Sequence, residues 1–221
     1  MGTAPSADTF PASVRWFRAS AERRALTLHS YRLAAEALER RSTGLAAGSW
    51  AVILDADETV IDNSPYQQEL ARRRATFDAA TWDEWVTRGV AAALPGAAEF
   101  TRRVRERGGR VVIVTNREQS QCDATRANLQ RAGIATDAVL CKTDPSNSFK
   151  DARFEAVANG TPPSTLPLLR IVMWVGDNIQ DFPRLRQDVR TASDSAFAEF
   201  GDRFIMLPNP MYGSWERNPL P

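Results

Sequence analysis

Asp55 and Asp57 lie two residues apart, directly after the apolar run 50–54 (Trp-Ala-Val-Ile-Leu), and their carboxylates could do chemistry together. A short, continuous apolar run of this kind is typical of a central parallel strand covered on both faces. Two carboxylates at the end of such a strand repel one another and lose hydration, so a folding core does not require them. A site that holds a divalent cation beside a reacting carboxylate does require them.

Polar residues follow two further apolar runs in the same way. The sequence Thr-Asn-Arg at 115–117 comes after the run 111–114, and Gly-Asp-Asn at 176–178 comes after the run 171–175. Parallel strands place their carboxyl ends at one edge of a sheet, and α/β proteins bind ligands beyond that edge. We therefore expect these polar side chains to lie close to Asp55.

If these positions converge, they form a phosphoryl-transfer site. Asp55 would be the nucleophile that attacks phosphorus and forms an aspartyl-phosphate intermediate. Asp57 would be the general acid that protonates the leaving alcohol, and then the base that activates water. Mg²⁺ prefers oxygen ligands in octahedral geometry, and Asp177 would bind it together with Asp55 and the backbone carbonyl of Asp57. The hydroxyl of Thr115 and the amide of Asn116 would hold the phosphate oxygens.

The use of lysine narrows the search for a phosphate-binding cation. The chain has 28 lysines and arginines together, but its only lysines are Lys142 and Lys150. An ammonium group on a thin stem can approach a phosphate oxygen where a planar guanidinium does not fit. Lys150 opens a predicted helix before the fourth strand, so its side chain can point back at the site. Lys142, directly after the third strand, is the second choice.

Each motif also has a reading without catalysis. Asp-x-Asp is common on protein surfaces, Gly-Asp-Asn alone is a turn signal, and Thr-Asn-Arg can cap a helix. The three motifs occur in order, each at the end of a predicted strand, and this argues against coincidence.

Length and composition limit the classes of protein. A chain of 221 residues can build one full-sized core with a small accessory lobe. Its hydrophobic content of 43% is ordinary for a soluble globular domain. A formal net charge of +1 gives no reason to expect a nucleic-acid polymer as partner. No stretch reaches the roughly 20 apolar residues that span a bilayer.

The residue inventory excludes several kinds of site. His29 is the only histidine, which excludes mechanisms built on paired histidines. Neither a Walker A loop nor a Gly-x-Ser-x-Gly sequence is present. Cys122 and Cys141 could form one bridge, but we expect two buried thiols. Residues 1–8 lack the charged and apolar regions of a signal peptide, so either the protein is cytoplasmic or an export segment has been removed.

Apolar runs alternate with helical patterns along the chain. Helices are predicted over 11–41, within 64–89, over 97–107 and 119–132, and in the segment that begins at 150. Strands are predicted over 50–54, 111–114, 138–141, 171–175 and 204–207. Strands that alternate with helices of ten or more residues form right-handed crossovers and a parallel sheet. The predicted fold class is therefore α/β, with a Rossmann-like parallel sheet.

Together these motifs resemble the haloacid dehalogenase (HAD) superfamily. The longer sequence Asp-Ala-Asp-Glu-Thr-Val-Ile-Asp-Asn-Ser-Pro-Tyr at 55–66 is similar to that of class C acid phosphatases, the bacterial lipoprotein 5′-nucleotidase family. Further stretches carry the resemblance across nearly the whole chain: 16–35, 82–85, 95–97, 114–117, 150–154, 175–182 and 204–215.

The resemblance implies roles for individual residues. Asp55 matches the family nucleophile, Asp57 the acid/base, and Lys150 the phosphate-holding lysine. Asp177 matches a metal ligand. Asp181 matches the second acid of the last motif, which braces the lysine or the waters bound to the metal.

The resemblance also implies how substrate is bound. Asn116 and Arg117 are expected to bind substrate, and Asn178 to support the site. Trp82 and Tyr212 fall on the positions where the family stacks aromatic rings against a nucleotide base, at about 1–3 kcal/mol per stack. Trp82 could instead be a core residue of the cap that pairs with Trp85.

We predict one domain over 1–221. A small helical cap would come from residues 11–41 and 64–89, and the α/β core from 49–63 and 95–210. The expected reaction is Mg²⁺-dependent hydrolysis of phosphomonoesters, preferentially nucleoside 5′-monophosphates or nicotinamide mononucleotide. A broad acid phosphatase without nucleotide preference, and a catalytically silent binding or storage protein, are the alternatives.

Two features depart from the resemblance. Family members usually carry a lipoprotein signal with a lipidated cysteine, and none appears in this sequence. The resemblance nevertheless implies export to the periplasm or outer membrane, with contact to a membrane only through such an anchor. It is also compatible with a homodimer. The connection between Cys141 and Lys150 is also longer than expected, which weakens the assignment of the lysine.

Overall fold

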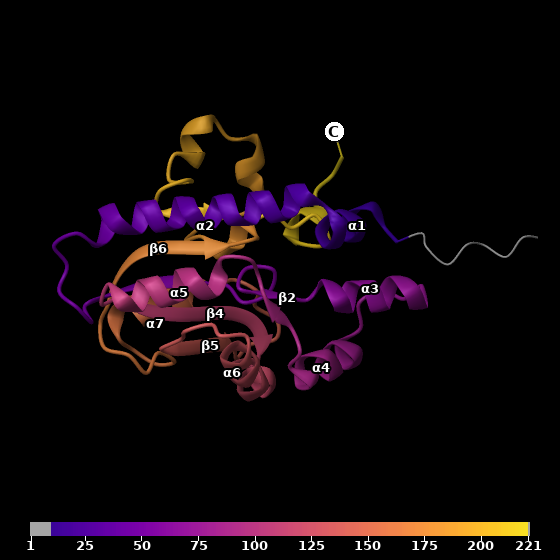
Figure 1. The fold of residues 1–221 in the computed structure, drawn as a ribbon, viewed down its shortest axis with the longest axis horizontal. Helices are drawn as coiled ribbons and strands as arrows, with labels where there is room; N and C mark the ends of the chain where they lie inside the picture. Colours follow the sequence, from indigo (N-terminus) through magenta and orange to yellow (C-terminus); the bar gives the residue numbers. More distant parts are fainter. Residues whose placement is uncertain (1–9, 221) are drawn as a thin grey trace, which may run out of the picture.

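Five parallel strands form the central sheet of the protein (Figure 1). The computed structural model describes residues 10–220. The strands lie in the order β5-β4-β1-β6-β7, and neighbours pair in parallel throughout. Their bounds are β1 (Trp50–Leu54), β4 (Arg110–Glu118), β5 (Ala138–Lys142), β6 (Arg170–Gly176) and β7 (Phe204–Met206). The predicted α/β fold with a parallel sheet is therefore confirmed.

Helices connect and flank the strands. The α-helices are α1 (Ala12–Ala19), α2 (Ala21–Ser42), α3 (Ser64–Arg73), α4 (Ala79–Arg88), α5 (Ala97–Glu106), α6 (Cys122–Arg131) and α7 (Asp151–Asn159). Short 3₁₀ turns cover Gln119–Gln121, Ile179–Asp181, Gln187–Thr191, Asp194–Phe197 and Ser214–Arg217.

Helices cover both faces of the sheet, which explains the unbroken apolar run of β1. Val52 and Leu54 pack in a core with side chains of α2, α5 and α6. Ala51 and Ile53 pack on the opposite face with Phe154 of α7. Successive side chains of a strand point to opposite faces, so a strand covered on both sides is apolar at every position.

The helical pattern predicted over residues 11–41 forms two helices. Ser20 has an extended backbone that ends α1. Its side-chain oxygen accepts a hydrogen bond from the backbone N–H of Arg23 (3.0 Å) and so caps α2. The long helix α2 then runs across the sheet (Figure 1).

Strand β4 extends to Glu118 and does not end at Val114 as predicted. Its register against β5 breaks between these two residues. The irregular stretch contains residues 115–117, so the Thr-Asn-Arg motif lies in the distorted end of a strand. The strand continues to Glu118 because Glu118 pairs with Lys142 of β5, a contact between residues separated in sequence.

A two-stranded antiparallel ribbon lies outside the main sheet. It consists of β2 (Ile61–Asp62) and β3 (Ala92–Ala93), and it joins the chain before α3 to the chain after α4. Strands of two residues carry no periodic signal, so the sequence did not predict them. Figure 1 shows α1, α3 and α4 gathered at the end of the molecule toward which β4 and β6 point. These helices belong to the segments predicted to form the cap.

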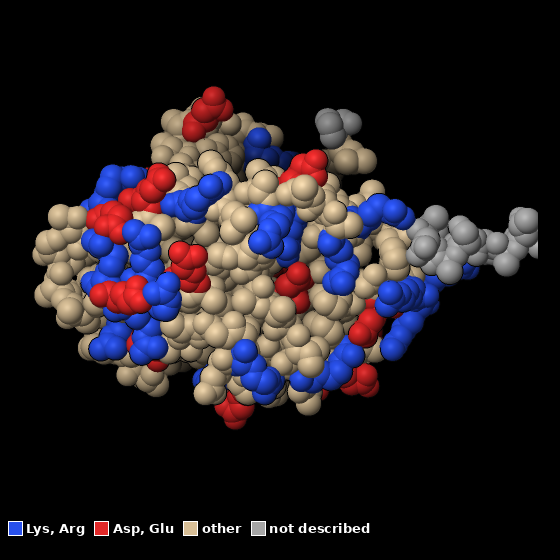
Figure 2. Space-filling model, in the orientation of Figure 1, with Lys and Arg blue, Asp and Glu red and all other residues tan. Residues whose placement is uncertain are grey.

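Charged side chains of both signs are intermixed on the face shown in Figure 2. Where α2 and α5 end, Glu39 pairs with Arg103 (2.6 Å) and with Arg107 (2.5 Å). Exposed pairs of this kind contribute little to stability, because water and salt screen their charges. The face therefore offers paired charges and no broad surface of one sign.

Cys122 and Cys141 form a disulfide, so the prediction of two separate thiols is wrong. Cys122 opens α6, Cys141 lies in β5, and their Cα atoms are 5.9 Å apart. The pairing of β5 with β4 and the packing of α6 against both strands bring the two residues together. A separation of 19 residues in sequence did not reveal this contact.

Replacing both cysteines by serine is expected to lower the free energy of unfolding by about 3 kcal/mol. The physical reason is that the bridge closes a loop of intermediate length and restricts the unfolded chain. Chemical denaturation of the wild type and of the double variant, each with and without reductant, measures the effect. Reductant should destabilise the wild type alone, and equal denaturation midpoints for all four samples would contradict the prediction.

Candidate active site

The predicted residues come together at the carboxyl ends of the central strands. Asp55 directly follows β1, and Asp177 directly follows β6. The backbone N–H of Asp55 donates to the carbonyl of Val175 (3.0 Å), which holds the two strand ends side by side. Carboxylate oxygens of Asp55, Asp177 and Asp181 all lie within 4.8 Å of one another.

Lys150 lies between two of these carboxylates. Its Nζ donates to Asp55 Oδ1 and to Asp181 Oδ1 (2.7 Å). The residue precedes α7, and the long connection after β5 brings it into the site. Lys142 Nζ instead donates to the carbonyl of Pro145 (3.3 Å). The geometry therefore places Lys150, rather than Lys142, beside Asp55.

The cluster is short of positive charge. Burial raises the pKa of Asp55 to about 7, against the opposing charge of Lys150, and Asp181 and Asp57 add to the rise. Burial also raises the pKa of Asp177 well above its usual range, and the charges of Asp181 and Asp55 reinforce the shift. An all-oxygen donor set with this deficit fits a hard divalent cation. Asp55, Asp177 and Asp181 are the residues that could hold it.

Lys150 itself remains charged in this setting. Burial disfavours its ammonium form, but the charges of Asp181 and Asp55 outweigh burial and raise its pKa. Two of its three protons are used by these carboxylates. One N–H is therefore left to bind a third acceptor.

The Gly-Asp-Asn motif positions the acids that follow β6. A Cβ at Gly176 would lie 2.3 Å from the Cβ of Asp181, so only glycine fits there. Asp181 Oδ2 accepts the backbone N–H of Asn178 (2.9 Å). Asn209 Nδ2 donates to Asp177 Oδ2 (2.8 Å), which orients the carboxylate from the C-terminal segment. The support expected of Asn178 and Asp181 is consistent with these contacts.

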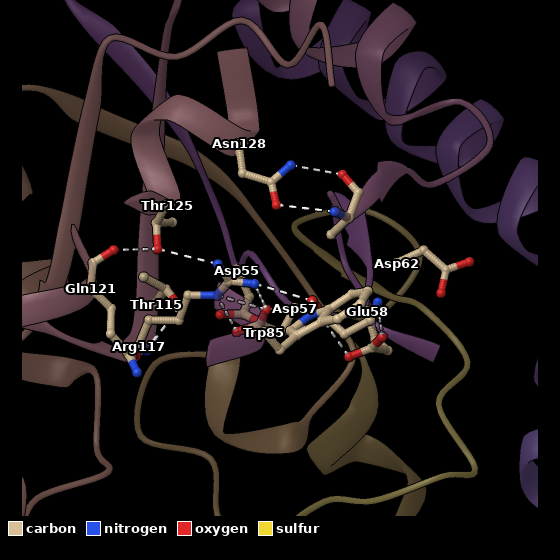
Figure 3. A network of polar contacts seen from close by, with 12 residues as sticks. Asp55, Asp57, Glu58, Asp62, Trp85, Thr115, Arg117, Gln121, Thr125 and Asn128 are labelled. Carbon is tan, nitrogen blue, oxygen red and sulfur yellow. Dashed lines mark hydrogen bonds and ion pairs between the residues drawn. The ribbon is translucent and has the colours of Figure 1, made fainter. Parts of the chain in front are cut away.

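Asp57 is held by a buried guanidinium. Arg117 donates to Asp57 Oδ1 through Nη2 (2.7 Å) and Nε (3.0 Å), while Nε also approaches Oδ2 (3.2 Å). The Arg117 side chain is 1% exposed and that of Asp57 is 18% exposed. Figure 3 shows the arginine reaching from β4 to the aspartate. Arg117, which we expected to bind substrate, thus directs its charge to Asp57.

Asn63 contacts the same carboxylate from the other side. Its Nδ2 donates to Asp57 Oδ1 (2.7 Å), and its Oδ1 accepts from Trp85 Nε1 (2.8 Å) and Arg117 Nη2 (3.1 Å). The backbone N–H of Asn63 donates to the fully buried Glu58 (2.7 Å). Burial, followed by the charges of nearby acids, raises the pKa of Glu58 well above its usual range.

Thr115 and Asn116 occupy different environments. Thr115 is buried, and its hydroxyl oxygen accepts the backbone N–H of Arg117 (3.1 Å). Within residues 10–220 its hydroxyl donates to no acceptor, so the proton can be offered to a ligand. Asn116 is exposed, and its side-chain amide bridges Arg153 (2.6 Å) and the carbonyl of Ser148 (2.9 Å). The Asn116 side chain therefore ties β4 to the loop before α7.

A pocket of about 730 Å³ opens onto Asp57. Trp82 and Tyr212, the two predicted stacking residues, both line it, together with Phe77. Each of the two is half-buried. Trp82 packs edge-on against Tyr66 with ring centroids 5.2 Å apart, and the guanidinium of Arg117 lies over its ring, 5.4 Å from the centroid.

Several residues of the site have no role in the sequence prediction. Asn63 and Glu58 lie inside the 55–66 motif. Their closeness in sequence to Asp55 and Asp57 was the signal that could have drawn attention to them. Trp85 was considered only as a core residue. Phe77 comes from the segment between α3 and α4, and no local pattern indicates its place in the site. Asn209 lies in the stretch 204–215 that carries the resemblance, but no role was assigned to it.

Comparison with family models and solved structures agrees with the fold. The chain matches the HAD superfamily, subfamily IIIB (acid phosphatase), over residues 3–215. The class C acid phosphatase from Bacillus anthracis superposes with a TM-score of 0.81 at 32% identity, covering 92% of this chain and 85% of that chain. Its tungstate-bound crystal structure gives a TM-score of 0.81 at 31% identity, with the same coverage.

Two plant proteins are also similar in sequence. The stem 31 kDa glycoprotein of Glycine max is 31% identical and acid phosphatase 1 of Solanum lycopersicum is 33% identical, each over 166 residues and 72% of this chain. The chain spans 58% and 57% of the lengths of these two relatives. Because the family match covers nearly the whole sequence, the chain belongs to the HAD superfamily, subfamily IIIB, the acid phosphatases.

Proposed function

We propose that this protein is a Mg²⁺-dependent phosphomonoesterase that works through an aspartyl-phosphate on Asp55. The observation that carries the proposal is the position of Asp55, which accepts a hydrogen bond from the Lys150 ammonium and lies within 4.8 Å of a carboxylate oxygen of Asp177. A nucleophile and a cation are thus in contact, and the proposed acid, Asp57, lines a pocket of its own. The tungstate bound by the Bacillus anthracis enzyme is a tetrahedral oxyanion like phosphate, and this supports a phosphate site here.

In the first step, an oxygen of Asp55 forms a bond to phosphorus while the ester P–O bond breaks. Asp57 gives its proton to the leaving oxygen. The remaining N–H of Lys150 and the free hydroxyl proton of Thr115 bind the phosphoryl oxygens, where charge is concentrated in the transition state.

In the second step, Asp57 takes a proton from water as the water attacks the phosphorus of the aspartyl-phosphate. The bond between phosphorus and Asp55 breaks, and phosphate leaves with the Asp55 carboxylate restored. Asp55, Asp177 and Asp181 would hold Mg²⁺, with the carbonyl of Asp57 as a further predicted ligand. When bound, the ion supplies positive charge to the phosphoryl oxygens and to the acids around them.

The proposed substrates are nucleoside 5′-monophosphates or nicotinamide mononucleotide. The pocket beside Asp57 is lined by aromatic and aliphatic side chains, including Phe77, Trp82, Met211 and Tyr212. A flat base can stack between such rings, and stacking of this kind contributes about 1–3 kcal/mol per base. A volume of about 730 Å³ leaves room for the base and its ribose.

Replacing Trp82 or Tyr212 with alanine tests the nucleotide preference. Loss of one stack is expected to lower kcat/KM for AMP by about 5- to 150-fold, because about 1–3 kcal/mol is lost. The value for p-nitrophenyl phosphate should fall less, since its ring is smaller. Steady-state kinetics with both esters gives the comparison, and Phe197→Ala, at an exposed ring outside the pocket, is the control. Equal losses on the two substrates would favour a broad acid phosphatase.

A phosphate-release assay tests the activity itself. Purified protein is incubated with nucleotide and simple phosphate esters, with and without EDTA, and free phosphate is measured. Release that depends on metal supports the proposal. No release from any ester, with Mg²⁺ present and the protein folded, would favour the binding or storage protein.

Export is proposed on separate grounds. Buried disulfides form and persist in oxidising compartments, and Cys122 pairs with Cys141. A similar plant protein is described as a glycoprotein. Within residues 10–220, no helix has the length and apolar character needed to cross a bilayer. A lipid anchor and a homodimer stay predictions.

A further inference from the structure

The contacts of Asp57 are unequally divided between its two oxygens. Oδ1 accepts short hydrogen bonds from Asn63 Nδ2 and Arg117 Nη2, both at 2.7 Å, and a third from Arg117 Nε at 3.0 Å. Among the residues that the structure describes, Oδ2 receives only the longer contact from Arg117 Nε, at 3.2 Å. An oxygen that already accepts from these donors has no place for a proton of its own. Oδ2 is therefore the oxygen available for proton transfer.

The amide of Asn63 is held in one orientation. Its Oδ1 lies beside Trp85 Nε1 and Arg117 Nη2, and both of these groups can only donate. The oxygen must therefore face them, which turns the Nδ2 donor toward Asp57. A flipped amide would place two acceptors against each other at 2.7 Å and leave the buried indole N–H without a partner.

The guanidinium of Arg117 is likewise committed. Nε and Nη2 donate hydrogen bonds to Asp57, and Nη2 also donates to Asn63 Oδ1. Nη1 donates to Thr125 Oγ1 (3.2 Å), in the first turn of α6. Figure 3 shows these contacts running between Thr125 and Asp57. The planar fork is thus fixed at both ends, so the carboxylate plane of Asp57 is fixed with it.

We propose that Arg117 and Asn63 are positioning residues that hold Asp57 so that Oδ2 delivers the proton to the leaving oxygen. The proposal rests on the function proposed above and refines the acid step of that reaction. As the bond from Asp55 to phosphorus forms and the ester P–O bond breaks, the proton on Asp57 Oδ2 passes to the departing oxygen. Arg117 and Asn63 give up no proton in this step.

Positioning of the acid predicts a dependence on the leaving group. Aryl phosphates of similar size can be compared in order of rising phenol pKa: 2,4-dinitrophenyl, p-nitrophenyl and phenyl phosphate. A dinitrophenolate leaves without protonation, whereas a phenolate needs the acid, and general acids contribute about 10²–10⁴-fold. Arg117→Met is expected to lower kcat/KM for phenyl phosphate by about 10²-fold and for the dinitrophenyl ester by less than about 5-fold.

Two further variants keep the test independent of folding. Arg117→Lys keeps the charge but loses the fork, and should give an intermediate dependence on the leaving group. Trp85→Phe keeps a ring but deletes the N–H that orients Asn63, and should shift the dependence in the same direction by a smaller amount. Arg41→Met is the matched control, because Arg41 donates to the carbonyl of Val172 (2.6 Å), which lies within β6 and outside the site. This variant should lower kcat/KM equally for all three esters, or leave it unchanged.

The outcomes separate the two proposals. A wild type that hydrolyses none of the three esters overturns the proposed function. A wild type that is active, with variants whose losses are equal for all three leaving groups, overturns the positioning role alone. The positioning role is supported if kcat/KM depends more steeply on the phenol pKa in Arg117→Met or Arg117→Lys, and in Trp85→Phe, than in the wild type. The Arg41→Met control should show the same dependence as the wild type.

Discussion

Asp55→Asn is expected to lower kcat by at least about 10⁴-fold, because an amide does not attack phosphorus and no aspartyl-phosphate can form. Lys150 keeps its bond to Asp181 in this variant, so the phosphate-binding cation stays in place. Phosphate release from p-nitrophenyl phosphate, measured at saturating substrate, gives the change in kcat.

The variant should remain folded, and this distinguishes loss of chemistry from loss of structure. Burial raises the pKa of Asp55 to about 7, which means that its charged form is costly to bury. A neutral asparagine removes that cost, so the thermal midpoint in the absence of metal should stay the same or rise. Asp123→Asn, the same change at a 97% exposed side chain, is the matched control for activity. Asp55→Asn that keeps more than a few per cent of wild-type kcat would show that the covalent mechanism is wrong.

Removal of the metal is expected to have the next largest effect. Chelation with EDTA should lower the rate by about 10³-fold or more, because the ion supplies several kcal/mol of charge stabilisation. Added Mg²⁺ should restore activity to the wild type. Asp177→Asn should need far more Mg²⁺ for half-maximal activity, while Asp123→Asn should need the same amount as wild type. Full activity in EDTA after exhaustive dialysis would exclude a metal-dependent mechanism.

The same site predicts how stability responds to pH. The pKa of Asp55 rises from an ordinary 3.8 to about 7 on folding, so the native state binds this proton more tightly than the unfolded chain. The resulting stabilisation is present below pH 3.8 and is lost as the pH rises through about 7. Mg²⁺ binds the ionised carboxylates, so it should raise the thermal midpoint more at about pH 7.5 than at about pH 5. An equal shift at both values would contradict this assignment.

The sheet and the strand-end acids could be predicted because their signals are local. A fully buried strand is apolar at every position, and β1 has the bounds expected from its sequence. Parallel pairing then places Asp55 and Asp177 at one edge whatever the details of the loops. Lys150 was also predicted, although the loop before it gave no indication of its path.

The contacts that complete the site could not be read from sequence, because they join residues far apart in the chain. Arg117 and Asp57 are separated by 60 positions, and neither motif indicates that one binds the other. Arginine beside a predicted phosphate site suggested a substrate ligand, whereas its burial and its fork geometry direct it to the acid. The disulfide was missed for the same reason, since the pairing of β4 with β5 and the packing of α6 decide it.

The most direct test of the account is a search for the phosphorylated enzyme. Asp57→Asn is mixed with 2,4-dinitrophenyl phosphate and Mg²⁺, quenched in acid, and digested for mass spectrometry. We predict that the peptide containing Asp55 gains the mass of one phosphoryl group, because the good leaving group departs without an acid while the base for hydrolysis is missing. Release of dinitrophenol with no phosphate attached to Asp55 at any time would contradict the central claim.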